Sequence, residues 1–341
     1  MRSAAFNTGP DYHLLDHIAP MAALLQCPLF TTEPLNDELA RRYYPQVETR
    51  YMPDLERHFR EIAEQFDVLY ECKYWQPHLK MLFQTLYRKE MKLIFCPHGQ
   101  SDKGYQAPLL APYALQDAVL VYGSLMLDML QELGIAVPEY QIVGNYRWEF
   151  YQQYRPFYDA LAPQIDRSKQ TLLYAPTWCD LDNASSYFQQ GARVISELPH
   201  DWNLILKVHP LLKQRTPAQF ESLAALIEER PNVYLLDAFP PVYPILALAD
   251  IYLGDASSVG YDFLLFEKPM YFFPTAHPGR LHTTGRTLDL AKPLYPQLKR
   301  DNPLAEAQRA LYLRAYSDSG GKMNRFCKSF KQVTRGRTSI E

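Results

Sequence analysis

Residues 251–266 read IYLGDASSVGYDFLLF and join a short apolar run to a helical pattern. The run Ile251–Leu253 is too short for a buried helix but has the composition of a buried strand. Small residues follow it, and Val259–Phe266 then predicts a helix. A strand that passes into a helix through a short loop is half of a strand–helix–strand unit, and such units build parallel sheets.

The same alternation runs through almost the whole chain. Six further candidate strands lie before residue 150, at Ala4–Asn7, Leu29–Thr32, Val68–Cys72, Leu93–Cys96, Val119–Tyr122 and Gln141–Val143. Four others are Thr171–Ala175, Leu204–Val208, Val233–Leu236 and Met270–Phe273. Helical patterns include Ser124–Leu133, with Gly134 placed for its C-terminal cap, and Pro217–Glu229, with Pro217 suited to a first turn. Near-continuous apolar strands predict parallel sheets covered on both faces.

The two sets of strands are separated by Arg155–Gln170, which reads as a helix and a linker. We therefore expect an α/β chain with two doubly wound parallel-sheet domains, residues 1–155 and residues 168–300, that face one cleft. Ligands of such sheets bind beyond the carboxyl ends of the strands. A single (β/α)₈ barrel with extra elements is the alternative, but eleven strands and the break in mid-chain count against it.

Composition excludes several classes of protein. The 341 residues carry 35 basic and 38 acidic side chains, so the chain lacks the basic excess of a nucleic-acid-binding protein. Five scattered cysteines without a Cys-x-x-Cys pair argue against a zinc ribbon or a dithiol redox site and fit a reducing compartment. The N-terminus lacks the apolar region of a signal peptide, and no apolar stretch reaches the ~18 residues of a membrane span. We expect a cytoplasmic protein.

The C-terminal segment, residues 301–341, is helical in pattern and ends in a basic tail. Its apolar stripe consists of Met323, Phe326, Cys327, Phe330 and Val333. Its other side carries Lys322, Arg325, Lys328 and Lys331. We expect a helix that packs back towards the first domain. Peripheral contact of the basic face with an anionic membrane is compatible with that packing.

Two histidines follow predicted strands at the edge where ligands bind. His98 comes after Leu93–Cys96, and its near-neutral pKa suits a general base. His209 comes after Leu204–Val208, and Lys207 alternates with it along the strand. A capping histidine in a loop, or a surface cation in the case of Lys207, would explain each residue equally well. His13 and His17 share one helix face but lack a zincin pattern, so we interpret them as structural.

Three more loops fall on the same side of the predicted sheets. Asp255, Ser257 and Ser258 precede a helix, where hydroxyls and amides bind anions, although a plain serine cap has the same sequence. Thr177 follows the strand Thr171–Ala175, and Arg147 follows Gln141–Val143 and could reach a phosphate. Asp180 and Asp182 are interpreted as loop acids, so we predict no metal site.

Together these loops resemble the CDP-glycerol glycerophosphotransferases, which build teichoic-acid-like poly(glycerol phosphate) of the cell envelope. The resemblance runs from Leu93 to Phe273. The family's tryptophan-His-Gly, Gly-aromatic-Pro-Arg-Asn-Asp and Tyr-Ala-Pro-Thr-Trp elements correspond to Cys96–Gly99, Gly144–Glu149 and Tyr174–Trp178. Its His-Pro loop and its Asp-Tyr-Ser-Ser-Val-x-Phe-Asp signature correspond to His209-Pro210 and Asp255–Asp262, with Lys268-Pro269 after them. Gln100, Ser101, Tyr146 and Ala256 depart from the family's threonine, proline, proline and tyrosine.

The resemblance implies a GT-B fold of two Rossmann-like domains, with the nucleotide mainly on the C-terminal one. It implies transfer of glycerol phosphate, or a related alditol phosphate such as ribitol phosphate, from its CDP donor to a hydroxyl, with release of CMP. The acceptor would be a polyol phosphate, a glycan or a glycolipid, and the protein would be cytoplasmic, with peripheral contact at the inner face of the cell membrane. His98 corresponds to the base, and His209, Ser257 and Ser258 correspond to the diphosphate clamp. Asp255 and Arg147 belong to the same motifs, and Lys207 and Thr177 are expected beside the donor.

Two other functions remain open from the sequence. One is a GT-B glycosyltransferase or sugar-nucleotide enzyme with a UDP- or CMP-sugar donor, since a fold does not fix a function. The other is a binding module that keeps the fold without turnover, against which the presence of both His98 and His209 argues. No cofactor is predicted.

Overall fold

The computed structural model describes residues 1–102, 107–178 and 185–317. Contacts divide the chain into two compact units. Unit 1 consists of Met1–Gln100, Gly104–Gln153 and Leu313–Glu341, and unit 2 consists of Ser101–Lys103 and Tyr154–Tyr312. The apolar stripe predicted at residues 323–333 and the loop acids Asp180 and Asp182 lie outside the described residues.

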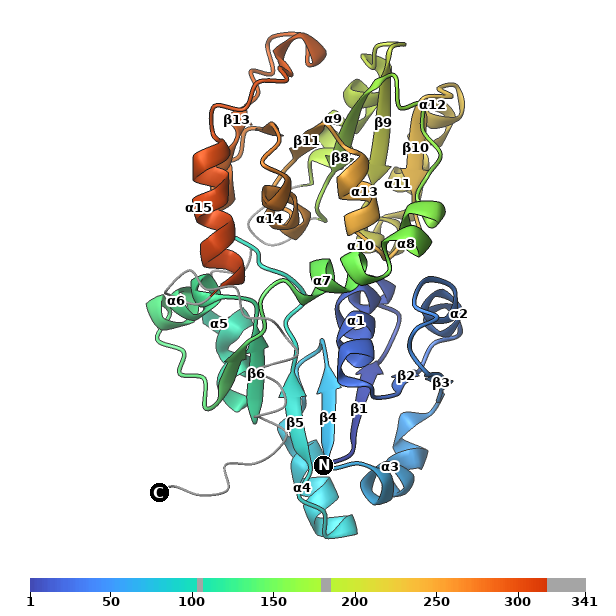
Figure 1. Cartoon of the computed structure of the whole chain (residues 1–341), viewed down its shortest axis with the longest axis vertical. Coiled ribbons are helices and arrows are strands. Elements are labelled where there is room, and N and C mark those ends of the chain that lie inside the picture. Colours follow the sequence, from blue (N-terminus) through green and yellow to red (C-terminus); the bar gives the residue numbers. More distant parts are fainter. Residues whose placement is uncertain (103–106, 179–184, 318–341) are drawn as a thin grey trace. The chain divides into compact units, whose positions relative to one another are not determined.

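Unit 1 is built on a seven-stranded sheet whose paired strands are all parallel (Figure 1). The strands are β1 (Ser3–Asn7), β2 (Leu29–Thr31), β3 (Thr49–Tyr51), β4 (Val68–Glu71), β5 (Lys92–Phe95), β6 (Ala118–Val121) and β7 (Tyr140–Ile142). Their order is β3-β2-β1-β4-β5-β6-β7. The chain therefore winds outwards in both directions from a switch point between β1 and β4.

Unit 2 repeats this plan with six parallel strands. They are β8 (Gln170–Ala175), β9 (Trp202–Lys207), β10 (Val233–Leu236), β11 (Ile251–Gly254), β12 (Met270–Phe272) and β13 (Arg286–Thr287). The order β10-β9-β8-β11-β12-β13 places the switch point between β8 and β11. The prediction of two doubly wound parallel sheets is confirmed, and the alternative of a single barrel is wrong.

All eleven predicted strands are present to within two residues at either end. The sequence missed β3 and β13, whose segments Thr49-Arg50-Tyr51 and Arg286-Thr287 are not apolar runs. Both strands lie at an edge of a sheet. Edge strands are less buried than central ones, so they lack the hydrophobic signal by which strands are found.

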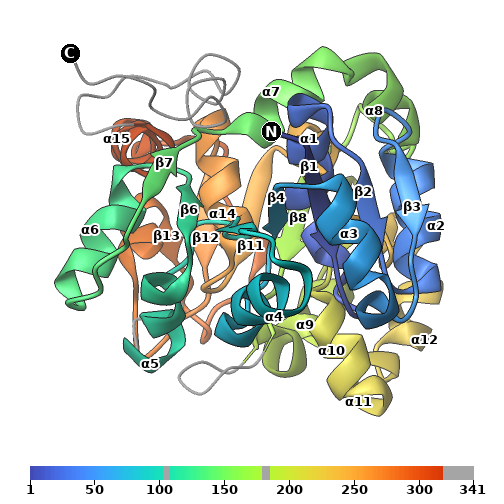
Figure 2. The same ribbon diagram turned by 90° about the horizontal axis from the view of Figure 1, so that it is seen from below.

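Helices connect the strands in both units. Those of unit 1 are α1 (Leu15–Leu25), α2 (Pro34–Tyr43), α3 (Phe59–Gln65), α4 (Pro77–Tyr87), α5 (Ala107–Leu110), α6 (Ser124–Glu132) and α7 (Tyr146–Gln153). Figure 2 shows α6 beside β6, which it contacts. Gly134 follows α6 with φ +70°, so it provides the predicted C-terminal cap, and its amide donates to the Gln131 carbonyl at 2.9 Å.

The helices of unit 2 are α8 (Arg155–Leu161), α9 (Ser186–Ser196), α10 (Pro210–Arg215), α11 (Pro217–Glu221), α12 (Ala224–Glu228), α13 (Tyr243–Leu248) and α14 (Ser258–Phe263). Helix α15 (Ala305–Tyr316) starts in unit 2 and ends in unit 1. The single helix predicted at Pro217–Glu229 is wrong, because the helix is interrupted between α11 and α12. The helix predicted at Val259–Phe266 ends at Phe263 and continues as the 3₁₀ turn Leu264–Phe266.

Each unit has its own hydrophobic core. Phe6, Phe30 and Trp75 are buried together in unit 1, whereas Leu172, Leu204 and Ile251 belong to the core of unit 2. Within the described ranges, none of the helices combines the length and the apolar character that a bilayer crossing requires.

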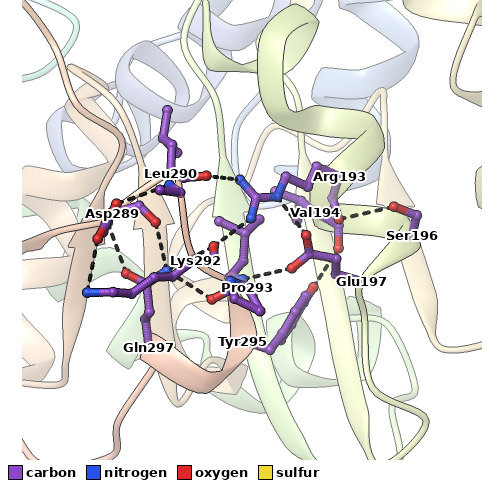
Figure 3. A network of polar contacts seen from close by, with 12 residues as sticks. Arg193, Val194, Ser196, Glu197, Asp289, Leu290, Lys292, Pro293, Tyr295 and Gln297 are labelled. Carbon is purple, nitrogen blue, oxygen red and sulfur yellow. Dashed lines mark hydrogen bonds and ion pairs between the residues drawn. The ribbon is translucent and has the colours of Figure 1, made fainter.

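A polar network holds the irregular segment after β13 against α9 (Figure 3). The Arg193 guanidinium donates to the Leu290 carbonyl at 2.8 Å, to the Lys292 carbonyl at 2.6 Å and to the Glu197 carboxylate at 2.6 Å. The Tyr295 hydroxyl donates to the Val194 carbonyl at 2.6 Å. Helix α9 is thereby fixed at its C-terminal end.

Candidate functional site

The carboxyl edge of the unit 2 sheet collects most of the predicted site residues. Strands β9, β8 and β11 are neighbours, so the residues that follow them meet at the same edge. Thr177 follows β8, His209 follows β9, and Asp255 and Ser257 follow β11. This edge includes the topological switch point, where open α/β sheets bind their ligands.

Asp255 connects the loops after β8 and β11. Its carboxylate accepts hydrogen bonds from the Thr177 amide at 2.7 Å, the Ser186 amide at 3.1 Å and the Ser186 hydroxyl at 2.7 Å. The Asp255 side chain is buried, and bonds of this kind favour the charged form of a carboxylate. Asp255 thus fixes the two loops and the start of α9 to each other.

The two predicted serines differ in their local roles. Ser257 is the N-cap of α14, where its hydroxyl accepts from the Val259 amide at 3.4 Å and its own amide donates to the Asp255 carbonyl at 2.7 Å. Ser258 is the first residue of α14 and is half-buried. Capping explains Ser257 on structural grounds alone, whereas it does not explain the hydroxyl of Ser258.

His209 begins α10 as its N-cap. Its Nδ1 accepts a hydrogen bond from the Leu211 amide at 3.2 Å. A neutral imidazole that accepts at Nδ1 carries its proton on Nε2, so Nε2–H is a hydrogen-bond donor. The Trp178 ring lies beside the imidazole, with 6.2 Å between the ring centroids. Such a donor matches an anionic oxygen.

Lys207 is the last residue of β9, two residues before His209. Its ammonium donates to the Phe239 carbonyl at 3.1 Å and is half-buried. The ammonium therefore brings a positive charge to this edge of the sheet, held by the loop after β10. The structure thus gathers Thr177, Lys207, His209, Asp255 and the serines in unit 2.

His98 lies in unit 1, just beyond the carboxyl end of β5. Its side chain is partly accessible to solvent, but the protein around it removes enough water to lower its pKa. Lys73 lowers the pKa further, whereas the Cys72 backbone and Asp11 raise it. An imidazole with a lowered pKa is neutral near pH 7, as a general base must be.

Two further histidines contact His98. The ring centroids of His13 and His17 lie 6.1 and 6.3 Å from that of His98. Sequence reasoning classified both as structural residues. Their position just after β1 was the available signal, since β1 and β5 end at the same edge of a parallel sheet.

A tyrosine network fixes the tautomer of His17. The Tyr146 hydroxyl donates to the His17 carbonyl at 3.1 Å, so the Tyr122 hydroxyl donates to Tyr146 across their 3.1 Å contact. Nδ1 of His17, 2.6 Å from the Tyr122 oxygen, must then donate to it. Burial lowers the pKa of His17 well below its usual value, with smaller effects from Arg147, His98 and His13. His17 is therefore neutral and has an acceptor at Nε2.

Arg147, which by its sequence position could reach a phosphate, forms an ion pair inside unit 1. Its guanidinium forms a buried ion pair with Asp16, 2.8 Å apart, and lies over the Tyr122 ring. Asp16 also accepts from the Tyr44 hydroxyl at 3.1 Å. Arg147 belongs to unit 1, so the structure does not group it with the serines of unit 2.

The carboxyl edge of unit 1 also contains charged groups that the sequence did not single out. Burial raises the pKa of Glu71, the last residue of β4, to about 7, although the Thr8 hydroxyl donates to it. The Lys73 ammonium donates to the Thr8 carbonyl at 2.6 Å and pairs with Asp11 at 2.7 Å. Glu71, Lys73 and Asp11 are brought together by folding, so no local sequence pattern reveals them.

The described part of the chain contains no group of three or more His, Cys, Asp or Glu side chains arranged to hold a metal ion. Among the described residues, Cys27, Cys72 and Cys96 are buried and form no disulfide. Burial raises the pKa of all three, so these thiols are protonated.

Known proteins resemble this chain both in sequence and in three-dimensional structure. Teichoic acid glycerol-phosphate primase of Bacillus spizizenii is 29% identical over 112 residues, which cover 32% of this chain and 27% of that protein. The wall teichoic acid polymerase TagF superimposes with a TM-score of 0.64 at 14% identity, over 99% of this chain and 90% of that structure. HepE of Anabaena, in complex with UDP and glucose, superimposes with a TM-score of 0.56 at 10% identity, over 98% of this chain and 100% of that structure. Both structures share the fold.

The family model of CDP-glycerol:poly(glycerophosphate) glycerophosphotransferases matches residues 159–339, more than half of the chain. The matched segment contains the site residues of unit 2 and begins after His98 and Arg147. This chain is a member of the CDP-glycerol:poly(glycerophosphate) glycerophosphotransferase family.

Proposed function

We propose that this protein transfers an alditol phosphate from a CDP-alditol, in the first place CDP-glycerol, to an acceptor hydroxyl. The hydroxyl oxygen would attack the phosphorus that bears the alditol. The bond from that phosphorus to the oxygen shared with CMP would break, and CMP would leave with the electron pair. The proton of the hydroxyl would pass to His98.

The observation that carries the proposal is the cluster at the carboxyl edge of unit 2, inside the segment that matches the family. His209 offers an Nε2–H donor, Ser257 and Ser258 offer hydroxyls, and Lys207 offers a positive charge. Phosphoryl transfer needs such groups, because charge on the non-bridging oxygens must be neutralised. Asp255 and Thr177 hold the loops in place through their hydrogen bond.

His98 is proposed as the base on geometric grounds. Its imidazole is partly accessible, its pKa is lowered, and it follows a strand at the edge of the sheet where ligands bind. A positioned base typically contributes ~10²–10⁴-fold to a rate. The accessible part of the His98 side chain would allow a polymeric or lipid-linked hydroxyl to reach it.

A thermal-shift panel tests the donor without an acceptor. The ligands are CDP-glycerol, CDP-ribitol, CMP, UDP-glucose, UDP-N-acetylglucosamine and CMP-sialic acid. At 100 times Kd, a ligand stabilises the protein by about 2.7 kcal/mol, which raises Tm by roughly 5–10 °C. We expect a shift with the CDP-alditols, and a shift with UDP-sugars alone would refute the proposal.

Two matched variants sharpen this panel. In His209→Ala the shift with CDP-glycerol should fall, because the Nε2–H donor is removed. In His200→Ala, which alters an exposed histidine two residues before β9, the shift should stay the same. Equal loss in both variants would mean that His209 does not contact the donor.

A second candidate function is supported by the structural likeness to HepE, whose structure holds UDP and glucose. It predicts a UDP-sugar donor for the same edge of unit 2. The thermal-shift panel separates the two candidates directly, because it presents both classes of nucleotide to one protein.

A further inference from the structure

The loop that carries His98 continues into unit 2. The chain passes from unit 1 to unit 2 between Gln100 and Ser101. In unit 2, the carboxylate of Asp102 accepts from the Tyr261 hydroxyl at 2.7 Å and from the Leu281 amide at 2.8 Å. The two bonds use different carboxylate oxygens. Hydrogen bonds to a charged acceptor are about twice as strong as bonds between neutral groups.

The partners of Asp102 belong to the elements that carry the proposed donor-binding groups. Tyr261 lies in α14, three residues after Ser258, and is buried. Leu281 lies in the 3₁₀ turn η5 (Arg280–Thr284), which follows β12. The two elements are in close contact, because a Cβ added at Gly260 would meet the Leu281 side chain. Asp102 is thus bonded to the element that begins with Ser258.

Gly279 shows that this packing is tight. A Cβ at Gly279 would overlap the Cβ, Cγ and Oδ2 atoms of Asp102. The φ of Gly279 is −90°, which any residue can adopt, so backbone conformation does not require glycine here. Glycine is required at position 279 because the Asp102 side chain lies too close for any other residue.

We propose that Asp102 is a positioning residue, and that its bonds to Tyr261 and Leu281 form a latch that fixes the loop of His98 to the donor-binding unit. The inference rests on the proposed function for the roles of His98 and of α14. Four residues of chain span at most about 14 Å, so a fixed Asp102 limits how far His98 can move from it. Alignment of a base with its substrate is worth a large rate factor, which small displacements reduce.

The first test measures the latch without any ligand, by hydrogen–deuterium exchange of peptides that cover residues 96–102 and 279–284. Tyr261→Phe removes one donor and restores the phenylalanine of the family signature, and Gly279→Ala displaces the Asp102 side chain. Both variants, and Asp102→Ala, should speed exchange in the two peptides roughly tenfold, the scale expected when a hydrogen bond to a charged group is lost. Unchanged exchange in all three variants would overturn the latch.

Tyr295→Phe is the matched control for Tyr261→Phe. It also removes a buried tyrosine hydroxyl of unit 2, which donates to the Val194 carbonyl at 2.6 Å. Its ring packs on Trp202, the first residue of β9, at the edge of the sheet opposite to the carboxyl edge. Exchange in the two peptides should stay at the wild-type rate in this variant, and equal acceleration would show that the effect is not specific to Asp102.

The second test asks whether the latch positions the base. It measures CMP release from CDP-glycerol with an oligo(glycerol phosphate) acceptor, and the dissociation constant of CDP-glycerol. We expect kcat to fall about tenfold in Tyr261→Phe while Kd changes less than twofold, since a displaced base affects turnover and not donor binding. Unchanged kcat would overturn the positioning role. A wild-type protein that neither binds nor uses CDP-alditols would refute the proposed function, whereas the exchange result would still decide the latch.

Discussion

The two sheets share one winding order, but their carboxyl edges have different chemistry. In unit 1 the imidazoles of His13 and His17 each lie against that of His98, and the pKa of His17 and of His98 is lowered. In unit 2 the edge presents hydroxyls and the Nε2–H of His209. The same topology thus provides one edge with imidazoles of lowered pKa and another with hydroxyls and an imidazole N–H donor. Residue types, and not the fold, make this distinction.

The carboxylates at the two switch points show the same difference. Glu71 ends β4 and Asp255 follows β11, so they have corresponding places beside the central strands. Asp255 accepts from two amides and a hydroxyl, whereas burial raises the pKa of Glu71 to about 7. Backbone donors decide whether a buried carboxylate stays charged.

Replacement of the proposed base, His98, should have the largest effect. In His98→Ala we expect kcat to fall by ~10²–10⁴-fold, because no group takes the proton of the attacking hydroxyl. The dissociation constant of CDP-glycerol should stay the same, since the groups proposed to bind the donor lie in unit 2. The control is His78→Ala, an exposed histidine at the start of α4. A tenfold or smaller loss of kcat would assign the base elsewhere and remove the contrast between the two edges.

Neutralisation of the buried carboxylate in unit 2 should come next. Asp255→Asn replaces one charged acceptor oxygen by an NH₂ group that faces donors. We expect the free energy of unfolding in urea to fall by about 3 kcal/mol, because hydrogen bonds to a buried charge are lost. Asp289→Asn, at an exposed aspartate of the same unit, serves as the control. A loss below about 1 kcal/mol would mean that the hydrogen bonds accepted by Asp255 contribute little to stability.

The corresponding substitution in unit 1, Glu71→Gln, should raise the free energy of unfolding instead of lowering it. The pKa of Glu71 rises from 4.5 to about 7 on folding, so the folded state binds more protons between these values. Its contribution to stability is therefore complete below pH 4.5 and is lost as the pH rises through 7. Glu71→Gln does not titrate, so relative to the wild type it should gain about 2 kcal/mol between pH 5 and pH 8. A pH-independent difference between the two proteins would contradict this.

The smallest expected effect is a displacement of the pH–rate profile. Burial lowers the pKa of His98 below its usual 6.5, and the base must be neutral to act. Activity should therefore rise with pH along an acid limb whose midpoint lies below 6.5. Measurement of kcat/KM between pH 4.5 and 8 reports this value for the free enzyme, and a midpoint at or above 6.5 would show that His98 is solvated like a surface histidine.

Most of the fold was predictable from the sequence because buried parallel strands are apolar runs. The polar edge strand β3 gave no such signal. Among the proposed site residues, His98 and His209 could be singled out because each follows an apolar run, at the edge where such sheets bind ligands. The packing of His17 against His98, and the bond from Tyr261 to Asp102 across 159 positions, depend on tertiary contacts that no local pattern encodes. The bond of Arg147 to Asp16, 131 positions away, is a tertiary contact of the same kind.

The way in which Arg193 holds the segment after β13 affects how this segment can change in evolution. The guanidinium binds the backbone carbonyls of residues 290 and 292, so it does not select their side chains (Figure 3). Leu290 and Lys292 are also exposed. Mutations can therefore accumulate at these two positions without moving the main chain, whereas Arg193 itself is constrained. The segment is a suitable place for sequence diversity in related proteins and for randomised libraries in the laboratory.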